Sequence, residues 1–340
     1  MLNYLNGDKK NFLKKLEKIL GNRNIRDNKS LLKVNKIIKD IEKHQDKALI
    51  KYEKKFSKVN RITNKDLTFS KKEINSTIKK LDTKTKTAID LAYKRIFYFH
   101  KQQKLKSYKI NDKYKNSFSY ISSPIEKVGV YVPGGKASYP SSVLMNCIPA
   151  IIAGVKEIYM TTPCLGKNYN SAVLYAAKKC KVKEIYKVGG AQAIAAFAYG
   201  TKTIKKVNKI VGPGNKYVAL AKKEVFGQVG IDMIAGPSEV TIVADKSSNA
   251  EWVAADLIAQ AEHDEYAQSI LITTNNKIIP KVNFFLKKQL NKLAKKQIAK
   301  KSLKKFGLVI YTQNEKKLID IINTIAPEHL EIFLKNSICY

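Results

Sequence analysis

The sequence predicts an α/β fold with two Rossmann-like open parallel-sheet domains and an N-terminal helical segment. Two patterns support this class. From Tyr120 onward, short runs of β-branched and aromatic residues alternate with amphipathic helical windows, which is typical of βαβ units in a parallel sheet. Before that point, apolar residues recur three and four positions apart, which indicates helices.

The N-terminal part is predicted to form two long helices, at residues 33–56 and 71–104. Both stretches lack Gly and Pro, so no residue in them interrupts the helical pattern. Thr83 or Thr85 is a candidate cap for the second helix, because a Thr hydroxyl can accept a hydrogen bond from a free backbone N–H at a helix start.

The α/β elements follow in a regular order that divides near Gly236. Before this point we expect strands at 128–132, 157–161, 184–188 and 209–211 and helices at 141–154, 171–180, 216–225 and from Ala191. After it we expect strands at 239–244, 269–273 and 308–311 and helices at 249–262, 279–299 and 316–324. Residues 126–238 are therefore predicted to form one inserted α/β domain, and residues 1–125 to pack with 239–340 as the other.

Length and composition are those of a globular chain. The 340 residues are 44% hydrophobic and 27% charged, and they contain no apolar stretch long enough to span a bilayer. The first residues lack the apolar core of a signal peptide, and the four Cys residues are scattered without zinc-finger spacing. These features predict a cytoplasmic protein with no membrane partner.

A formal net charge of +36 is compatible with nucleic-acid binding, because clustered Lys and Arg neutralise phosphates. Lysine is spread over the whole chain, however, and Arg occurs only at positions 23, 26, 61 and 95. Proteins that read bases and phosphates favour the forked guanidinium of Arg. We therefore interpret the charge as a compositional bias on solvated surfaces and expect no nucleic-acid partner.

Four glycine-containing loops follow predicted strands. They are YVPGG at 131–135, GGAQ at 189–192, GPGN at 212–215 and GPSE at 236–239. Glycine lets the backbone approach a ligand closely, and a following helix start offers free N–H groups to an anion such as a dinucleotide pyrophosphate. The spacing G-x-G-x-x-G is absent, however, and a single loop of this kind is most often a tight turn.

Gln260 and His263 lie three residues apart at the end of the predicted helix 249–262, so their side chains project from one face. An imidazole nitrogen and an amide oxygen are both workable ligands for Zn²⁺ or Mn²⁺. Two ligands do not make a site. The alternative is a helix end at which His263 interacts with the helix dipole and Gln260 lies in water.

Glu328 and His329 form a second pair, directly after Pro327. The proline pushes the preceding residue toward an extended conformation, which predicts a loop that leaves the helix before it. A histidine on a loop beside a carboxylate suits a general base, since the carboxylate can raise its proton affinity or handle a water molecule. The alternative is an ordinary surface pair.

Taken together, these segments resemble histidinol dehydrogenase, from NGD at 6–8 to the last residues of the chain. The resemblance is carried by VYVPGG at 130–135, YPSSVLM at 139–145, VGGAQAIAA at 188–196, GPGN at 212–215, AGPSEV at 235–240, QAEH at 260–263 and PEHL at 327–330. So many runs in the same order are far more specific than any one of them.

The resemblance implies a zinc- and NAD-dependent oxidation of L-histidinol, through the aldehyde, to L-histidine, with two NAD⁺ consumed. Tyr131, Gln192 and Asn215 would contact NAD. The residues implied on the substrate side are Ser238, Gln260, His263 and His329, of which Gln260 and His263 would also bind zinc, and Glu328 and His329 would be the catalytic pair. The resemblance also implies a homodimer for the full-length protein, and a common pocket for the substrate-side residues that faces the nucleotide cleft.

One departure from the family accompanies this resemblance. Family members continue beyond the position of Tyr340, and the downstream Asp and His that complete their zinc site have no counterpart here. Catalytic zinc usually has at least three protein ligands. The sequence is therefore interpreted either as an incomplete reading of a longer protein or as a truncated product with impaired zinc-dependent turnover. The rival hypotheses are a non-catalytic nucleotide-binding relative and a dehydrogenase of another small polar alcohol.

Overall fold

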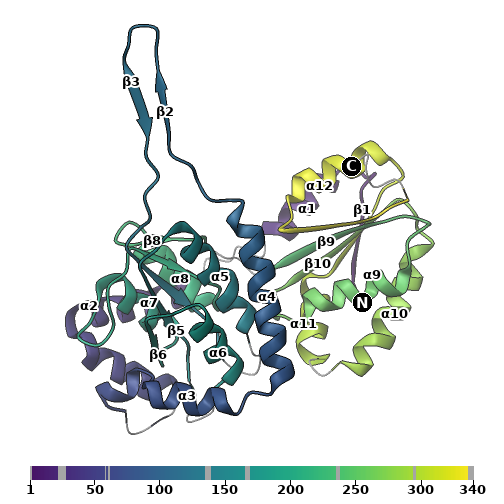
Figure 1. Ribbon diagram of the computed structural model, residues 1–340. Helices are drawn as coiled ribbons and strands as arrows, with labels where there is room; N and C mark the ends of the chain where they lie inside the picture. The colour runs from purple at the N-terminus through teal and green to yellow at the C-terminus, as the bar shows by residue number, and fades with distance from the viewer. Residues whose placement is uncertain are drawn as a thin grey trace. The chain divides into compact units, whose positions relative to one another are not determined.

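The computed structural model describes residues 2–21, 28–57, 59, 62–134, 139–164, 169–234, 238–293 and 296–335. The chain separates into two compact units, residues 1–26 with 236–340 and residues 27–235. Each unit contains a five-stranded parallel sheet with helices on both faces (Figure 1). The predicted α/β class with two Rossmann-like open sheets is confirmed. The predicted loop at Gly236-Pro237 and Cys339 lie outside the described residues.

The N-terminal helices belong to a different unit from the one predicted. We expected residues 1–125 to pack with 239–340, but only the first 26 residues do so, and residues 27–125 join the unit that contains 126–235. The physical reason is the apolar stripe of the first long helix. Val34, Ile41 and Leu49 are fully buried in one hydrophobic cluster with the helices that cover the 126–235 sheet.

The larger unit, residues 27–235, has the strand order of a Rossmann fold. Its helices are α2 (Asn28–Ser57), α3 (Lys71–Lys79), α4 (Thr83–Lys101), α5 (Pro140–Ala153), α6 (Ser171–Lys179), α7 (Gly190–Tyr199) and α8 (Lys216–Val225), with a short 3₁₀ turn, η1 (Asn64–Leu67). Its parallel strands are β4 (Lys127–Tyr131), β5 (Glu157–Thr161), β6 (Glu184–Tyr186), β7 (Lys209–Val211) and β8 (Gly230–Ile231). They lie in the order β6-β5-β4-β7-β8, so the winding reverses between β4 and β7.

Two hydrophobic clusters cover the two faces of this sheet. Helices α2, α7 and α8 share one cluster with Tyr131, Tyr159 and Ile210 of the strands. Helices α3 to α6 share the other with Val130 and Met160. Neighbouring residues of a strand point to opposite faces, so the inner positions of strands covered on both sides are apolar, as they are in β4 and β5.

The smaller unit, residues 1–26 with 236–340, repeats the same winding. Its strands are β1 (Asn3–Asn6), β9 (Glu239–Ala244), β10 (Gln268–Thr273), β11 (Leu308–Tyr311) and β12 (His329–Phe333), and its helices are α1 (Phe12–Gly21), α9 (Ala250–Ala261), α10 (Ile278–Lys292), α11 (Lys296–Phe306) and α12 (Glu315–Ile325). The strand order is β1-β11-β10-β9-β12, all parallel. Helices α9, α10 and α11 cover one face, and α1 and α12 cover the other.

Several boundaries differ from the sequence-based expectation. The predicted helix 71–104 is two helices, because Asp82 accepts a hydrogen bond from the backbone N–H of Thr85 (2.7 Å) and caps a new helix. The cap is thus Asp82 rather than Thr83 or Thr85. The predicted helix 279–299 likewise divides into α10 and α11. Strand β1 and helix α1 were not predicted.

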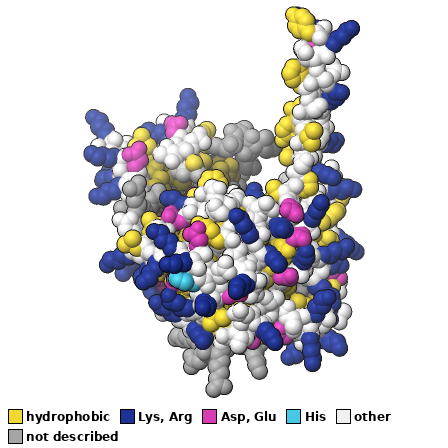
Figure 2. Space-filling model, turned by 90° about the vertical axis from the view of Figure 1, so that its left-hand side faces the viewer, with side chains coloured by type: hydrophobic (Ala, Val, Ile, Leu, Met, Phe, Trp, Pro, Cys, Tyr) yellow, Lys and Arg dark blue, Asp and Glu magenta, His cyan; other side chains and the backbone are white. Residues whose placement is uncertain are grey.

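A long hairpin, β2 (Tyr108–Asn111) and β3 (Ser117–Tyr120), was also absent from the prediction. It extends away from the rest of the larger unit, and all eight of its strand residues are exposed (Figure 1). Lys and Arg side chains are scattered over the face seen in Figure 2 rather than gathered in one patch, which agrees with the interpretation of the charge as compositional. Among the described helices, none is long and apolar enough to cross a membrane.

Glu73 ties the N-terminal helices to the sheet of the larger unit. Its carboxylate accepts hydrogen bonds from the backbone N–H of Ser70 (2.8 Å), from Tyr169 (3.1 Å) and from Lys187 (2.6 Å). Burial alone would raise the pKa of Glu73, but the hydrogen bonds from Lys187 and Ser70 outweigh it and lower the pKa to about 2.

This lowered pKa predicts a pH-dependent contribution to stability. A carboxylate whose pKa is lowered in the folded state stabilises the fold at pH values above its ordinary pKa of 4.5. This contribution is lost as the pH falls from 4.5 toward 2. We expect Glu73→Gln to lower the free energy of unfolding at pH 7 by about 1 kcal/mol, because the partly exposed pair is screened by solvent. Urea unfolding of both proteins at several pH values measures this difference. A difference that stays constant down to acidic pH would contradict the assignment.

Candidate active site

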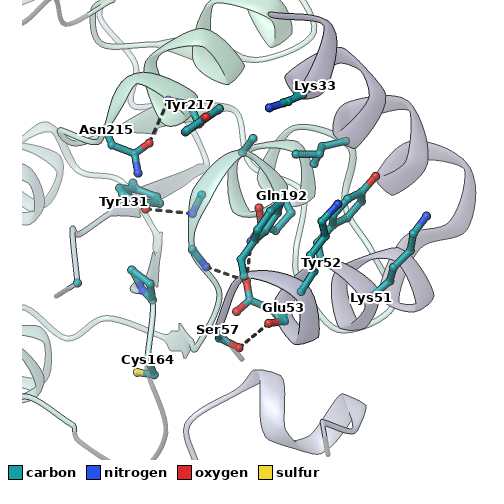
Figure 3. A pocket seen from close by; sticks show the side chains of 18 of the residues that line it. Lys33, Lys51, Tyr52, Glu53, Ser57, Tyr131, Cys164, Gln192, Asn215 and Tyr217 are labelled. Atoms are coloured by element: carbon teal, nitrogen blue, oxygen red, sulfur yellow. Dashed lines mark hydrogen bonds between the residues drawn. The ribbon is translucent and has the colours of Figure 1, made fainter. Parts of the chain in front are cut away.

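The larger unit has a cavity of about 740 Å³ at the carboxyl ends of its strands, beside the reversal between β4 and β7 (Figure 3). Open α/β sheets bind ligands at this position, because the loops on either side of the reversal diverge and leave a crevice. The volume is within the usual range for small-molecule and cofactor sites. Three predicted residues, Tyr131, Gln192 and Asn215, line it.

Tyr131 is the last residue of β4, and its hydroxyl accepts a hydrogen bond from the backbone N–H of Gly190 (3.1 Å). Burial raises the pKa of Tyr131 to about 12, so the hydroxyl remains protonated at neutral pH. The bond joins the end of β4 to the start of α7, which carries Gln192. Two of the glycine loops identified in the sequence therefore meet at this point.

Asn215 caps helix α8. Its side-chain oxygen accepts hydrogen bonds from the backbone N–H groups of Tyr217 (3.0 Å) and Val218 (3.2 Å). The capping oxygen is thus committed to the helix, while the amide nitrogen of the same side chain can donate to a ligand in the cavity.

The loop that leads to Asn215 requires a glycine at its first position. Gly212 has a φ of +112°, and a Cβ there would lie 2.1 Å from the carbonyl oxygen of Tyr131. An ion pair between buried Lys222 and solvent-exposed Asp232 supports this loop: Lys222 donates to the carbonyl of Gly212 (3.1 Å) and to Asp232, which also accepts from the N–H of Gly212 (2.8 Å). The sequence analysis did not identify this pair.

Helix α2 forms another wall of the cavity, which the sequence analysis also missed. It contributes Tyr52, Glu53 and Phe56 together with Lys33, Lys36, Lys51 and Lys55. The signal in the sequence was a carboxylate on an apolar helix face, since Leu49, Tyr52 and Glu53 are all buried. Burial raises the pKa of Glu53, although hydrogen bonds from Gln192 and Gly189 oppose the rise.

The other predicted site residues lie in the smaller unit, at the amino edge of its sheet. Ser238 precedes β9, and His329 opens β12, which pairs with β9. Gln260 and His263 lie at the end of α9, the crossover helix between β9 and β10. Because a crossover helix runs antiparallel to the strands it joins, its carboxyl end returns to their amino edge. The prediction of a loop at His329 was wrong, because this residue begins an edge strand.

The strand register brings His329 to the face that α9 covers. His329 and Glu331 are in register with Val240 and Ile242, whose side chains pack in the cluster that contains α9. Glu331 also interacts with Asp256 of α9: burial and the nearby Asp256 raise its pKa.

The same geometry predicts the position of Gln260 relative to His329. From Glu331 back to His329 is about 6.6 Å along the strand. From Asp256 forward to Gln260 is about 6 Å along the helix, in the same direction and on the same helix face. The contact between Glu331 and Asp256 therefore brings His329 and Gln260 toward each other at the amino edge.

Glu328 is held by a reciprocal pair of backbone contacts with Glu239. Its carboxylate accepts from the N–H of Glu239 (3.4 Å), and its own N–H donates to the carboxylate of Glu239 (3.2 Å). The Glu328 carboxylate lies 3.9 Å from Nε2 of His329. Both side chains are about half exposed, so each is accessible to a ligand or to water.

Gln260 is a buried polar residue whose hydrogen bonds are incomplete among the described residues. It is 9% exposed, and its side-chain nitrogen is buried without a hydrogen bond among the described residues. An unsatisfied buried polar group costs about 1–3 kcal/mol. A bound ligand or metal ion would satisfy the amide, which can turn its oxygen inward by rotation about its last bond.

The donor set for a metal is nevertheless small. Gln260 and the exposed His263 offer one oxygen and one nitrogen donor, both suited to zinc. No group of three or more His, Cys, Asp or Glu residues that could hold a metal occurs in the described part of the chain. The two residues fit as part of a zinc site rather than as a complete one.

The predicted residues therefore form two groups. Tyr131, Gln192 and Asn215 line one cavity, and the remaining five share one sheet edge in the other unit. That the second group faces the nucleotide cavity remains a prediction.

Comparison with known proteins gives consistent matches. A family model described as histidinol dehydrogenase matches residues 21–339. Proteins named histidinol dehydrogenase from Pelagibacter ubique and Acinetobacter baylyi are 56% and 41% identical to the chain over 337 residues. Each alignment covers 99% of the chain and 78% of the relative.

A solved structure agrees over the whole chain. The crystal structure of histidinol dehydrogenase from Elizabethkingia anophelis superimposes with a TM-score of 0.88 at 38% sequence identity. The match covers 100% of this chain and 77% of that one.

Proposed function

The chain belongs to the histidinol dehydrogenase family of oxidoreductases, and from this premise we propose that it oxidises L-histidinol to L-histidine with NAD⁺ in histidine biosynthesis. The observation that carries the proposal is the cavity at the strand-order reversal, lined by Tyr131, Gln192 and Asn215. We assign these three residues to NAD binding. Bound there, NAD⁺ supplies the acceptor for hydride.

The cavity offers chemistry that suits a dinucleotide. Its wall is largely apolar and includes Tyr52 and Phe56, against which a flat ring can pack. Lys33, Lys36 and Lys55 contribute positive charge at the same wall, where phosphates gain from nearby cations. The Tyr131 hydroxyl and the amide groups of Gln192 and Asn215 supply the few polar contacts that orient a cofactor.

We assign the substrate to the amino edge of the smaller sheet, with Ser238, Gln260, His263 and His329 as its contacts. Gln260 and His263 would hold Zn²⁺ together with ligands from outside the described residues. Bound zinc orients an amino alcohol and polarises its oxygen. The side-chain nitrogen of Gln260, which is buried without a hydrogen bond among the described residues, supports this assignment.

Glu328 and His329 are the proposed acid–base pair. In the first oxidation, His329 takes the proton of the substrate hydroxyl as hydride leaves the carbinol carbon. In the second, Glu328 takes a proton from the water that adds to the aldehyde carbon, and a second hydride leaves. The contact between the carboxylate of Glu328 and the N–H of Glu239 holds this side chain beside His329. We further propose a cytoplasmic homodimer for the full-length protein.

The test is NADH formation from L-histidinol by the purified protein supplied with zinc. We expect two NADH for each L-histidine formed, and loss of turnover on chelation that returns when zinc is added. Binding of NADH is measured in parallel by titration calorimetry, because it does not require a complete metal site. NADH formation from another small alcohol but not from histidinol would reject the proposed substrate, and absence of NADH binding would reject the proposed cofactor site.

A further inference from the structure

Glu53 is a buried carboxylate at the wall of the nucleotide cavity. It is 5% exposed and lies on α2, about one turn before this helix ends at Ser57. One of its carboxylate oxygens accepts hydrogen bonds from the side-chain amide of Gln192 (2.8 Å) and from the backbone N–H of Gly189 (3.2 Å), as Figure 3 shows. A single oxygen thus holds both the start of α7 and the side chain that follows it.

These two contacts, together with the bond from Gly190 to Tyr131, hold the turn and the Gln192 side chain in one arrangement. Gly189 and Gly190 leave the backbone at the start of α7 with few steric restraints, and Gly190 has a φ of +65°. Gln192 can rotate about three side-chain bonds, and holding it in one arrangement in advance removes an entropic cost from ligand binding. With its nitrogen bonded to Glu53, the Gln192 amide keeps its oxygen as the group that remains to accept a hydrogen bond.

We infer that Glu53 is a positioning residue of the nucleotide site, which orients the Gln192 amide and the Gly189–Gly190 turn for the cofactor. The inference rests on the proposed function, since it assumes that a dinucleotide occupies this cavity. Glu53 acts through the length of its side chain and its accepting oxygen rather than through its charge.

Asp46 provides a matched control on the same helix. It is also 5% exposed, and its carboxylate accepts hydrogen bonds from the hydroxyl of Thr203 (2.8 Å) and from its backbone N–H (3.3 Å), just beyond the other end of α7. Asp46 and Glu53 therefore both tie α2 to the α7 region, but only Glu53 lines the cavity.

The experiment compares Glu53→Asp, Glu53→Gln and Asp46→Ala with the unchanged chain in NADH binding by titration calorimetry. Glu53→Asp keeps the charge but withdraws the carboxylate by about 1.5 Å, beyond hydrogen-bond reach of Gln192. Glu53→Gln loses the charge but keeps the length and an accepting oxygen. We expect the Kd for NADH to rise about 5- to 10-fold in Glu53→Asp and to change less than about 2-fold in Glu53→Gln and Asp46→Ala.

Adding Glu53→Asp to Gln192→Ala tests the route of the effect, and we expect little further loss of affinity in the double variant. The inference fails if Glu53→Asp binds NADH like the unchanged chain, if Glu53→Gln is the weaker of the two, or if Asp46→Ala weakens binding as much as Glu53→Asp does. If the unchanged chain does not bind NADH, the proposed function fails as well. The two failures are thus distinguishable.

Discussion

We expect His329→Gln to lower the kcat for L-histidinol oxidation by about 10²- to 10⁴-fold, because glutamine fills a similar space but cannot take up a proton. His329 lies at the start of β12, on the face covered by α9 and 3.9 Å from the carboxylate of Glu328. The Kd for NADH should be unchanged, since the cavity assigned to NAD is lined by residues of the larger unit. Steady-state rates with histidinol and titration with NADH measure the two effects separately.

His100→Gln is the matched control for this variant. His100 is near the end of α4 and bonds through Nδ1 to Gln103 on the exposed surface (2.6 Å). We expect its replacement to leave kcat within about 2-fold of the unchanged protein, as is usual for a surface site without a special role. A His329→Gln protein that turns histidinol over at the rate of the His100→Gln protein would remove His329 from the reaction.

Local patterning was enough to predict most of the fold. Most strands of the two sheets and most of their crossover helices were expected within a few residues of their observed bounds, because short apolar runs and helical windows differ in period, whereas β1, β8 and β12 were not predicted. The helix break at Asp82 was missed because its capping carboxylate lies within a continuous helical pattern. Strand β12 was missed because Pro327 and the exposed His329 suggest a loop, whereas pairing with β9 is a tertiary contact.

The wrong domain assignment of α2 shows that local sequence patterns do not specify the tertiary partner of a helix. The apolar stripe of α2 indicates that the helix packs on something, but it does not indicate which sheet. The assignment of α2 to the wrong unit also hid Glu53, since a helix expected elsewhere was not considered as a wall of the cavity. Tyr131, Gln192 and Asn215 were identified from the family resemblance and from loops at strand ends, which topology brings together at one edge.

Local sequence patterns likewise did not indicate the ion pair of buried Lys222 and exposed Asp232, because one residue lies on α8 and the other follows β8. Lys222 is only 3% exposed, although the sequence of its helix is amphipathic and lysine-rich and therefore predicts that its lysines are exposed. Its role follows from its contacts with the Gly212 carbonyl and with Asp232, which itself accepts from the N–H of Gly212, in the turn that approaches Tyr131 and leads to Asn215. The pair therefore connects the stability of the larger unit to the geometry of its ligand loop.

We expect Lys222→Met to lower the free energy of unfolding of the larger unit by about 1 kcal/mol, because the change removes the hydrogen bonds to the Gly212 carbonyl and to the solvent-accessible carboxylate of Asp232. Methionine fills nearly the same volume, so the loss reports the missing charge and hydrogen bonds rather than a cavity. Urea unfolding measures the change. We also expect weaker NADH binding, since the Gly212 carbonyl loses the donor that fixes the turn.

Lys223→Met is the matched control, because the adjacent lysine on the same helix is exposed, and we expect a change within about 0.5 kcal/mol. A second comparison of unfolding free energies separates the destabilisation by an unpaired charge from the stabilisation by the ion pair. Replacing Asp232 alone by Leu should destabilise the unit more than replacing Lys222 and Asp232 together by apolar residues, since only the single change leaves the buried ammonium of Lys222 without its counterion. NADH binding should stay weak in the double variant, because the Gly212 turn still lacks both of its partners. Equal unfolding curves for Lys222→Met and Lys223→Met would show that the pair does not support the loop.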